Sequence, residues 1–140
     1  MSDVADLLDP YQALKLFIHK DTWMTSNQRK HWSENRDKIT VLRQSTCFHA
    51  RKNLLKPIHE PVWIHARIGL PHRRQFDPPN AWPTIKPIID GLVDASVLQD
   101  DDSTHVPYTS FSRDPTKSPK DKYRITIYLV PESSEIYVPF

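Results

Sequence analysis

The sequence predicts an α+β domain with two helices packed on a single sheet of about four strands. Two observations lead to this class. Four short segments have the residue pattern of strands, and two longer segments space their apolar residues as helices do. In addition, 13 prolines and only 2 glycines divide the chain, mostly where these patterns break. The expected order is strand, helix, strand, helix, strand, strand, which is typical of a mixed α/β layer.

The first strand is expected at residues 13–20, where Leu14, Leu16 and Ile18 alternate with more polar side chains. A long helix with a basic outer face is expected from about residue 30 to residue 55, because this stretch contains no Gly or Pro. Its core side is assigned to residues that recur mostly at helical spacing, namely Trp32, Ile39, Leu42, Thr46, Ala50 and Leu54.

Three more strands are expected, at residues 62–70, 105–112 and 122–130. In the first of these, one side of the strand is apolar and carries Val62, Ile64, Ala66 and Ile68. This alternation predicts that one face of the sheet is covered by the helices.

A short helix is expected to begin near Thr84, whose hydroxyl is placed to cap it, because Pro87 is tolerated only in a first turn. At about 100° per residue, one side of this helix is apolar and carries Ile85, Ile88, Ile89, Leu92 and Val93. The adjacent side carries Lys86, Asp90 and Asp94. One side is therefore assigned to the core and the next to chemistry.

The length of 140 residues predicts one domain, residues 1–140, with residues 1–12 and 132–140 as tails. A single cysteine excludes an internal disulfide and a C-x-x-C zinc site. The acidic N-terminus has no apolar run of the kind found in signal peptides, and no long apolar stretch follows. A cytoplasmic protein is expected.

Charge is distributed unevenly along the chain. Residues 1–74 carry 13 Lys and Arg against 7 Asp and Glu, whereas residues 75–140 carry 6 against 10. A metal-dependent nuclease requires both kinds of surface, because cations hold phosphates while carboxylates hold the metal. Such halves also arise by chance in soluble domains, so the distribution alone leaves both interpretations open.

Three carboxylates fall on separate elements: Asp77 after the second strand, Asp90 on the polar side of the short helix, and Asp101 in the following loop. Carboxylates placed together repel unless a positive group joins them, and Mg²⁺ prefers oxygen ligands. Lys86, one turn before Asp90, could contact a phosphate. The alternative is an exposed ion pair between Lys86 and Asp90, with Asp101 in a solvated turn.

The motifs in this order resemble the RusA-type Holliday junction resolvases, over about Leu16 to Val130. The shared features are S-N-x-R before the long helix, an Asp and an Asn, a Lys, then D-G-L-V-D-A and a D-D pair. In this chain they are Ser26, Asn27, Arg29, Asp77, Asn80, Lys86, Asp90 and Asp101. Two departures stand out, since Pro79 replaces the second carboxylate of D-x-D-N and the gap from Asn80 to Lys86 is longer than usual.

The resemblance implies catalytic roles for Asp77, Lys86, Asp90 and Asp101, and a Mg²⁺ site, which Mn²⁺ could also fill, formed by Asp77, Asp90, Asp101 and Asp102. It also implies a homodimer that resolves branched DNA by paired symmetric nicks in recombination, repair or phage DNA processing, in a bacterial or phage-infected cell. The expected DNA contacts are Asn27, Arg29, Lys30, Arg36, Arg67, Arg73, Arg74 and Asn80.

Two alternatives remain open from the sequence. The loss of the second D-x-D carboxylate at Pro79 is compatible with a catalytically degraded protein that binds junctions or shapes DNA. A structural domain without a nucleic-acid partner is the other. The first differs from the nuclease in lacking Mg²⁺-dependent nicking, and the second in lacking salt-sensitive affinity for branched DNA.

Overall fold

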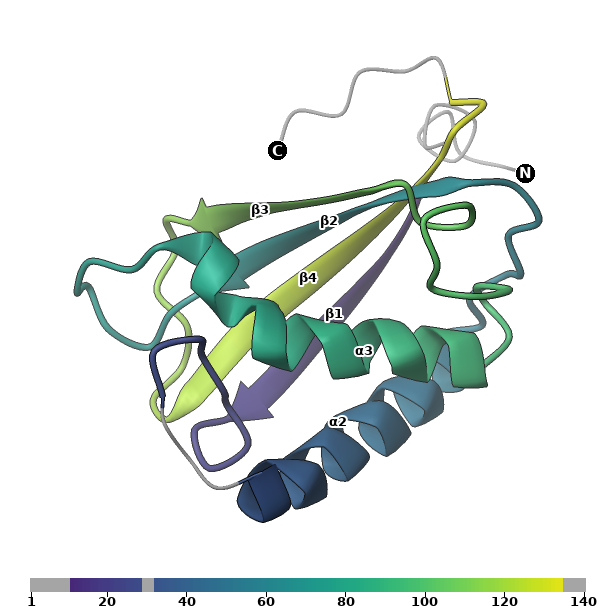
Figure 1. The fold of residues 1–140 in the computed structure, drawn as a ribbon. Coiled ribbons are helices and arrows are strands. Elements are labelled where there is room, and N and C mark those ends of the chain that lie inside the picture. The colour runs from purple at the N-terminus through teal and green to yellow at the C-terminus, as the bar shows by residue number, and fades with distance from the viewer. Residues whose placement is uncertain (1–10, 29–31, 135–140) are drawn as a thin grey trace.

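A computed structural model describes residues 11–28 and 32–134, so Arg29, Lys30 and most of the two expected tails lie outside the described residues. The predicted order of elements is confirmed (Figure 1). The elements are β1 (Gln12–His19), α2 (Trp32–Lys52), β2 (Val62–Gly69), the 3₁₀ turn η1 (Pro78–Ala81), α3 (Trp82–Asp94), β3 (Tyr108–Asp114) and β4 (Lys122–Pro131).

The four strands form one mixed sheet in the order β1-β4-β2-β3. Strand β4 is antiparallel to both β1 and β2, while β2 and β3 are parallel. Strands β1, β2 and β3 therefore run in the same direction, and the loops that follow them gather at one end of the sheet (Figure 1). Ligand sites of open α/β sheets commonly lie at this end.

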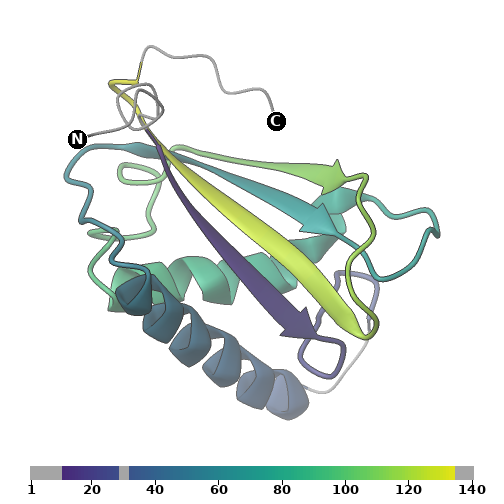
Figure 2. The same cartoon turned by 180° about the vertical axis from the view of Figure 1, so that it is seen from behind.

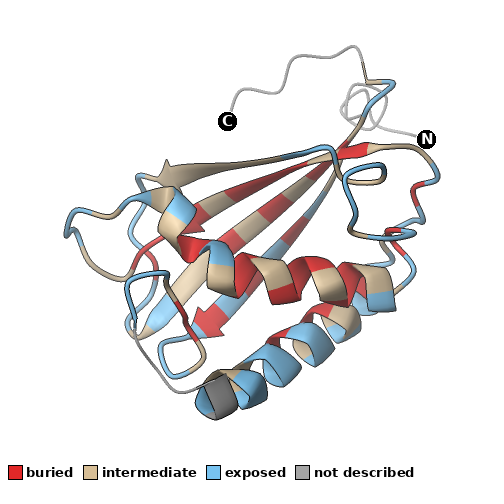
Figure 3. Cartoon of the chain, viewed as in Figure 1, coloured by how far each residue is buried: buried red, intermediate tan, exposed pale blue. Residues whose placement is uncertain are grey.

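The strands alternate buried and more exposed side chains, as the burial stripes in Figure 3 show. On one face, Leu16 pairs with Ile125 and Ile125 with Ile68, so a continuous apolar row crosses three strands. Both helices lie against this face (Figure 1). The opposite face, seen in Figure 2, is not covered by any helix within the described ranges.

Helix α3 packs closely against α2 at Gly91. A Cβ on Gly91 would lie 2.6 Å from the carbonyl oxygen of Arg43 and 2.7 Å from the Cβ of Thr46, so only glycine allows this approach. In the part of the chain that the structure describes, neither helix is long and apolar enough to cross a bilayer.

The core side expected for α2 is correct at Leu42, Thr46 and Ala50, which are buried. It is wrong at Ile39 and Leu54, whose side chains are 38% and 82% exposed. Leu54 lies after the last residue of α2 and has a positive φ of 55°, so it belongs to the turn that ends the helix. Ile39 lies within α2 but on its more exposed side, and the side chain of Trp32 lies outside the described part of the structure.

The start of α3 also differs from the prediction. The helix begins at Trp82 after the N-cap residue Ala81, which places Pro87 in the second turn. Thr84 is buried inside the helix and does not cap it, because its hydroxyl is bound to the backbone of Met24. Strand β3 begins at Tyr108 and not at residue 105. The amides of His105 and Val106 donate to the carbonyl of Asp102, so these residues form a turn before the strand.

Candidate functional site

The loop after β1 is held against the segment that leads into α3. The Met24 amide donates to the Thr84 hydroxyl, and this hydroxyl donates to the Met24 carbonyl, both at 2.8 Å. The Ser26 amide donates to the carbonyl of Asn80 at 2.9 Å. These bonds fix residues 24–26 against η1 and the first turn of α3, so two sequence-distant segments meet at one end of the sheet.

A hollow of about 470 Å³ lies where these segments meet, and it is lined by Asn27, Gln75, Phe76, Asp77 and Asn80. Asp77 is exposed, and its carbonyl accepts the Asn80 amide at 2.9 Å, which begins η1. Its carboxylate does not cap the turn. Three residues expected to contact metal or DNA are thus brought together here, although Asn27 comes from a different loop.

A second cluster lies on the polar side of α3. The Lys86 ammonium donates to Asp90 Oδ1 at 2.7 Å and also to Asp101 Oδ2. Lys86 and Asp90 are one helical turn apart, whereas Asp101 reaches the ammonium from the loop after the helix. The arrangement is more than the exposed pair of the alternative interpretation, because a third group from another element joins it.

The charges of this cluster depend on one another. The hydrogen bond from Lys86 is the largest cause that lowers the pKa of Asp101, to about 2, and partial burial opposes it. Burial alone would lower the pKa of Lys86, but the hydrogen bonds to Asp101 and Asp90 raise it overall. The cluster therefore joins two acidic side chains to one basic side chain, and this excess of acidic groups favours a cation.

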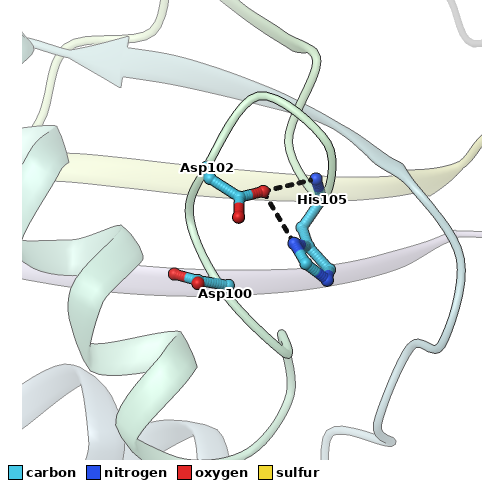
Figure 4. Close-up of side chains that lie close together, drawn as sticks. All are labelled: Asp100, Asp102 and His105. Atoms are coloured by element: carbon cyan, nitrogen blue, oxygen red, sulfur yellow. Dashed lines mark hydrogen bonds and ion pairs between the residues drawn. The ribbon is translucent and has the colours of Figure 1, made fainter.

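A group with metal-ligand chemistry lies in the loop after α3, formed by Asp100, Asp102 and His105 (Figure 4). One ligand atom from each lies within 4.8 Å of the others. Asp102 Oδ1 also accepts the ring Nδ1–H of His105 at 2.7 Å and the amides of Thr104 and His105, both at 3.0 Å. These hydrogen bonds lower the pKa of Asp102. The bond from the His105 side chain has the largest effect.

Within the described ranges, no other three acidic, histidine or cysteine side chains gather within that distance. Asp77, Asp90 and Asp101 do not meet in this way: Asp90 and Asp101 share the Lys86 ammonium, and Asp77 lines the separate hollow. Asp102 is directed to His105, a residue that the sequence analysis did not select. The spacing D-x-x-H was the signal that was available for it.

The expected DNA contacts are spread over several surfaces. Arg73 and Arg74 are exposed in the loop between β2 and η1, at the same end of the sheet as Asp77. Arg36 is exposed near the start of α2. Arg67 is on the sheet face opposite the helices, where its Nη2 lies 3.9 Å from Asp114 Oδ1.

Comparison of the chain with protein-family models gave no match, and no curated protein proved similar to it. The resemblance to the junction resolvases therefore depends on the motifs quoted above. The features of the molecule that bear on function are the two clusters, the hollow at the end of the sheet and the cations around it.

Proposed function

We propose that the protein is a Mg²⁺-dependent, structure-selective DNA endonuclease that acts as a homodimer and resolves four-way or branched DNA by paired symmetric nicks. The observation that carries the proposal is the convergence of Asp90 and Asp101, from a helix and from a loop, on the ammonium of Lys86. The meeting of Asn27, Asp77 and Asn80 at the end of the sheet adds support, since the resemblance assigns these residues to the same site.

The donor chemistry at Lys86 is suited to Mg²⁺. Carboxylate oxygens are its preferred protein ligands, and those of Asp90 and Asp101 already converge on a positive charge. These two residues would hold the ion. The resemblance also implies Asp77 and Asp102 as ligands, but here Asp77 lines the separate hollow and Asp102 is bonded to His105. When bound, Mg²⁺ supplies water activation and neutralises charge that develops on the phosphate.

The other roles belong to the chain itself. Lys86 has three N–H donors, so it can bind a phosphate oxygen while it keeps one carboxylate. In that position its charge opposes the negative charge that grows on the phosphate in the transition state. Arg73 and Arg74 are exposed beside the loop of Asp77 and would hold neighbouring phosphates. A two-fold dimer would present two such sites to the two equivalent strands of a junction.

A second function is favoured by one specific observation. Pro79 lies in η1 at the position where the resolvase motif has its second carboxylate, and Asp77 does not join the other acids in a close group. A protein that binds junctions without cutting them would have this arrangement. The two functions share a DNA-binding surface and differ in chemistry.

Nicking and binding, measured separately, test the proposal. A labelled four-way junction is incubated with the protein in Mg²⁺ or EDTA, and binding is measured in EDTA. The nuclease predicts Mg²⁺-dependent nicks that Asp90→Asn and Asp101→Asn abolish while junction binding persists. The matched control is Asp37→Asn, an exposed acid on α2 that takes part in no ion pair within the described residues and should nick normally.

Binding without nicking by the unmodified protein would refute the nuclease and leave the junction-binding protein. Equal affinity for a junction and for a linear duplex, independent of salt, would refute both, because phosphate contacts make DNA binding salt-dependent.

A further inference from the structure

The loop between β3 and β4, residues 115–121, is fixed to the loop that follows β2. The Ser118 amide donates to the carbonyl of Leu70 at 2.8 Å. The guanidinium of Arg113, on β3, donates to the carbonyls of Arg74 at 2.7 Å and His72 at 3.3 Å. The two loops therefore form one surface at the end of the sheet that also holds Asp77.

This surface has two adjoining hollows. The first, of about 290 Å³, has Arg73, Arg113 and Lys117 among its lining residues. The second, of about 570 Å³, is lined in part by Lys117, Lys120 and Arg124. Lys117 lines both, so the two hollows are contiguous and cations extend from one to the other.

Two acids next to this surface, Asp114 and Asp121, already face a cation. Asp114 accepts from Arg124 at 3.0 Å and also lies near Arg67. Asp121, at the end of the loop, lies 3.6 Å from Lys20. The surface therefore has an excess of positive charge.

Four exposed cations of the two loops take part in no ion pair within the described ranges, and they are Arg73, Arg74, Lys117 and Lys120. Nearby cations affect the pKa of His72. Burial is the largest cause that lowers this pKa, and the positive charges of Arg74, Arg113 and Lys117 lower it further. Like charges gathered on one surface repel one another, and a bound anion relieves this repulsion.

We propose that Arg73, Arg74, Lys117 and Lys120, named here the basic surface, bind the phosphate backbone of a duplex arm of the DNA substrate. Arg113 positions the two loops and is not itself a contact, because two backbone carbonyls already accept its N–H groups. The inference rests on the proposed function for the identity of the partner, but it does not need cleavage. It adds the β3–β4 loop to the DNA-binding residues.

A nucleic acid is a better partner for this surface than an acidic peptide. Duplex DNA carries one negative charge per about 1.7 Å of helix axis, so an arm laid across two contiguous hollows meets several cations at once. Loop 70–77 also connects the basic surface directly to the hollow of Asp77. A strand held by the basic surface would therefore continue towards Asp77.

Salt-dependent binding of the double variant Lys117→Gln/Lys120→Gln tests the inference. Both side chains are exposed and lie outside the described ion pairs, so the fold should persist, as circular dichroism would verify. Affinity for a fluorescent four-way junction and for a linear duplex is measured by anisotropy in EDTA over a range of salt. The matched control is Lys52→Gln/Lys56→Gln, which removes the same charge from exposed positions at and after the end of α2.

Each lost phosphate contact reduces the magnitude of the slope of log K against log salt by about 0.9. The slope of the double variant should therefore be smaller by about 1.8, for the four-way junction and for the linear duplex alike. The control should keep the slope of the unmodified protein. An unchanged slope in the double variant, with normal binding by the unmodified protein, would overturn this inference alone. So would competition by polyglutamate as strong as that by DNA, because it would indicate an acidic protein partner.

Failure of the proposed function gives different results. Absence of DNA binding by the unmodified protein would overturn both proposals. Junction binding with the expected loss of slope, but without Mg²⁺-dependent nicks, would overturn the nuclease and support the basic surface.

Discussion

The ion pair between Lys86 and Asp101 makes a quantitative prediction for the variant Asp101→Asn. The pKa of Asp101 is lowered from 3.8 to about 2 by its hydrogen bond with Lys86. This difference corresponds to about 2 kcal/mol of folding free energy. The two side chains are 41% and 30% exposed, so solvent screening reduces the contribution to about 1 kcal/mol. The variant should lose this amount near pH 6.

The sign of the pH dependence is fixed. A carboxylate whose folded pKa is depressed stabilises the protein above its unfolded pKa, and this stability is lost as the pH falls from 3.8 towards 2. At pH 3 the deficit of the variant should fall to about half. Urea unfolding followed by tryptophan fluorescence at both pH values measures it. Asp37→Asn, at an exposed position of α2, is the control and should change stability by less than about 0.5 kcal/mol.

A deficit that stays the same at pH 3 would contradict the assignment of the stability to this ion pair. A more stable variant would show that repulsion from Asp90, Asp100 and Asp102 outweighs the attraction to Lys86.

Three further predictions concern the fold. Gly91→Ala should destabilise the protein by about 1–3 kcal/mol, because the new Cβ would lie 2.6 Å from the Arg43 carbonyl oxygen. The cost of this clash exceeds the gain of about 1 kcal/mol in helix propensity. An unchanged melting temperature would refute the prediction. Arg43→Lys should cost only about 0.5 kcal/mol in urea unfolding, since the two-bond contact with Asp94 (2.5 and 2.9 Å) is exposed, and a loss of several kcal/mol would disagree. Burial, aided by Arg67, lowers the pKa of His65 from 6.5 to about 4, so the unmodified protein should lose about 2 kcal/mol between pH 7 and pH 5 that His65→Gln does not lose. Parallel pH profiles for the two proteins would count against this last prediction.

The elements of the fold could be predicted from the sequence because each has a local pattern. The alternation of Leu14, Leu16 and Ile18 is sufficient to predict β1 and its buried side. In β2, alternation along the strand directs Arg67 to the face of the sheet away from Ile64 and Ile68. Its position on that face could therefore also have been inferred from the sequence.

The strand order and the end of the sheet at which the loops meet were not predictable in this way. They depend on pairing between distant strands, as between Ile68 and Ile125. The failure at Thr84 has the same cause, because its hydroxyl bonds to Met24, a residue 60 positions earlier in the chain. Local capping rules do not include such a partner.

The candidate site was predictable in part. The helical spacing of Lys86 and Asp90 indicated their pair, and the family resemblance, counted from Asp90, favoured Asp101 over Asp102. The meeting of Asn27 with Asp77 came only from the family resemblance, since no local pattern relates the two loops. Apart from the charge of the two side chains, nothing in the sequence indicated that Lys117 and Lys120 belong to the proposed DNA-binding surface. The basic surface forms only when the β3–β4 loop is bonded to Leu70.

A calorimetric titration with Mg²⁺ of the unmodified protein, Asp90→Asn and His105→Gln tests where the ion binds. If Asp90 and Asp101 hold it beside Lys86, as proposed, the Mg²⁺ site should be lost in Asp90→Asn and retained in His105→Gln. A site that persists in Asp90→Asn, or that disappears in His105→Gln, would instead assign the ion to the group of Asp100, Asp102 and His105 and refute a Mg²⁺ site at Lys86.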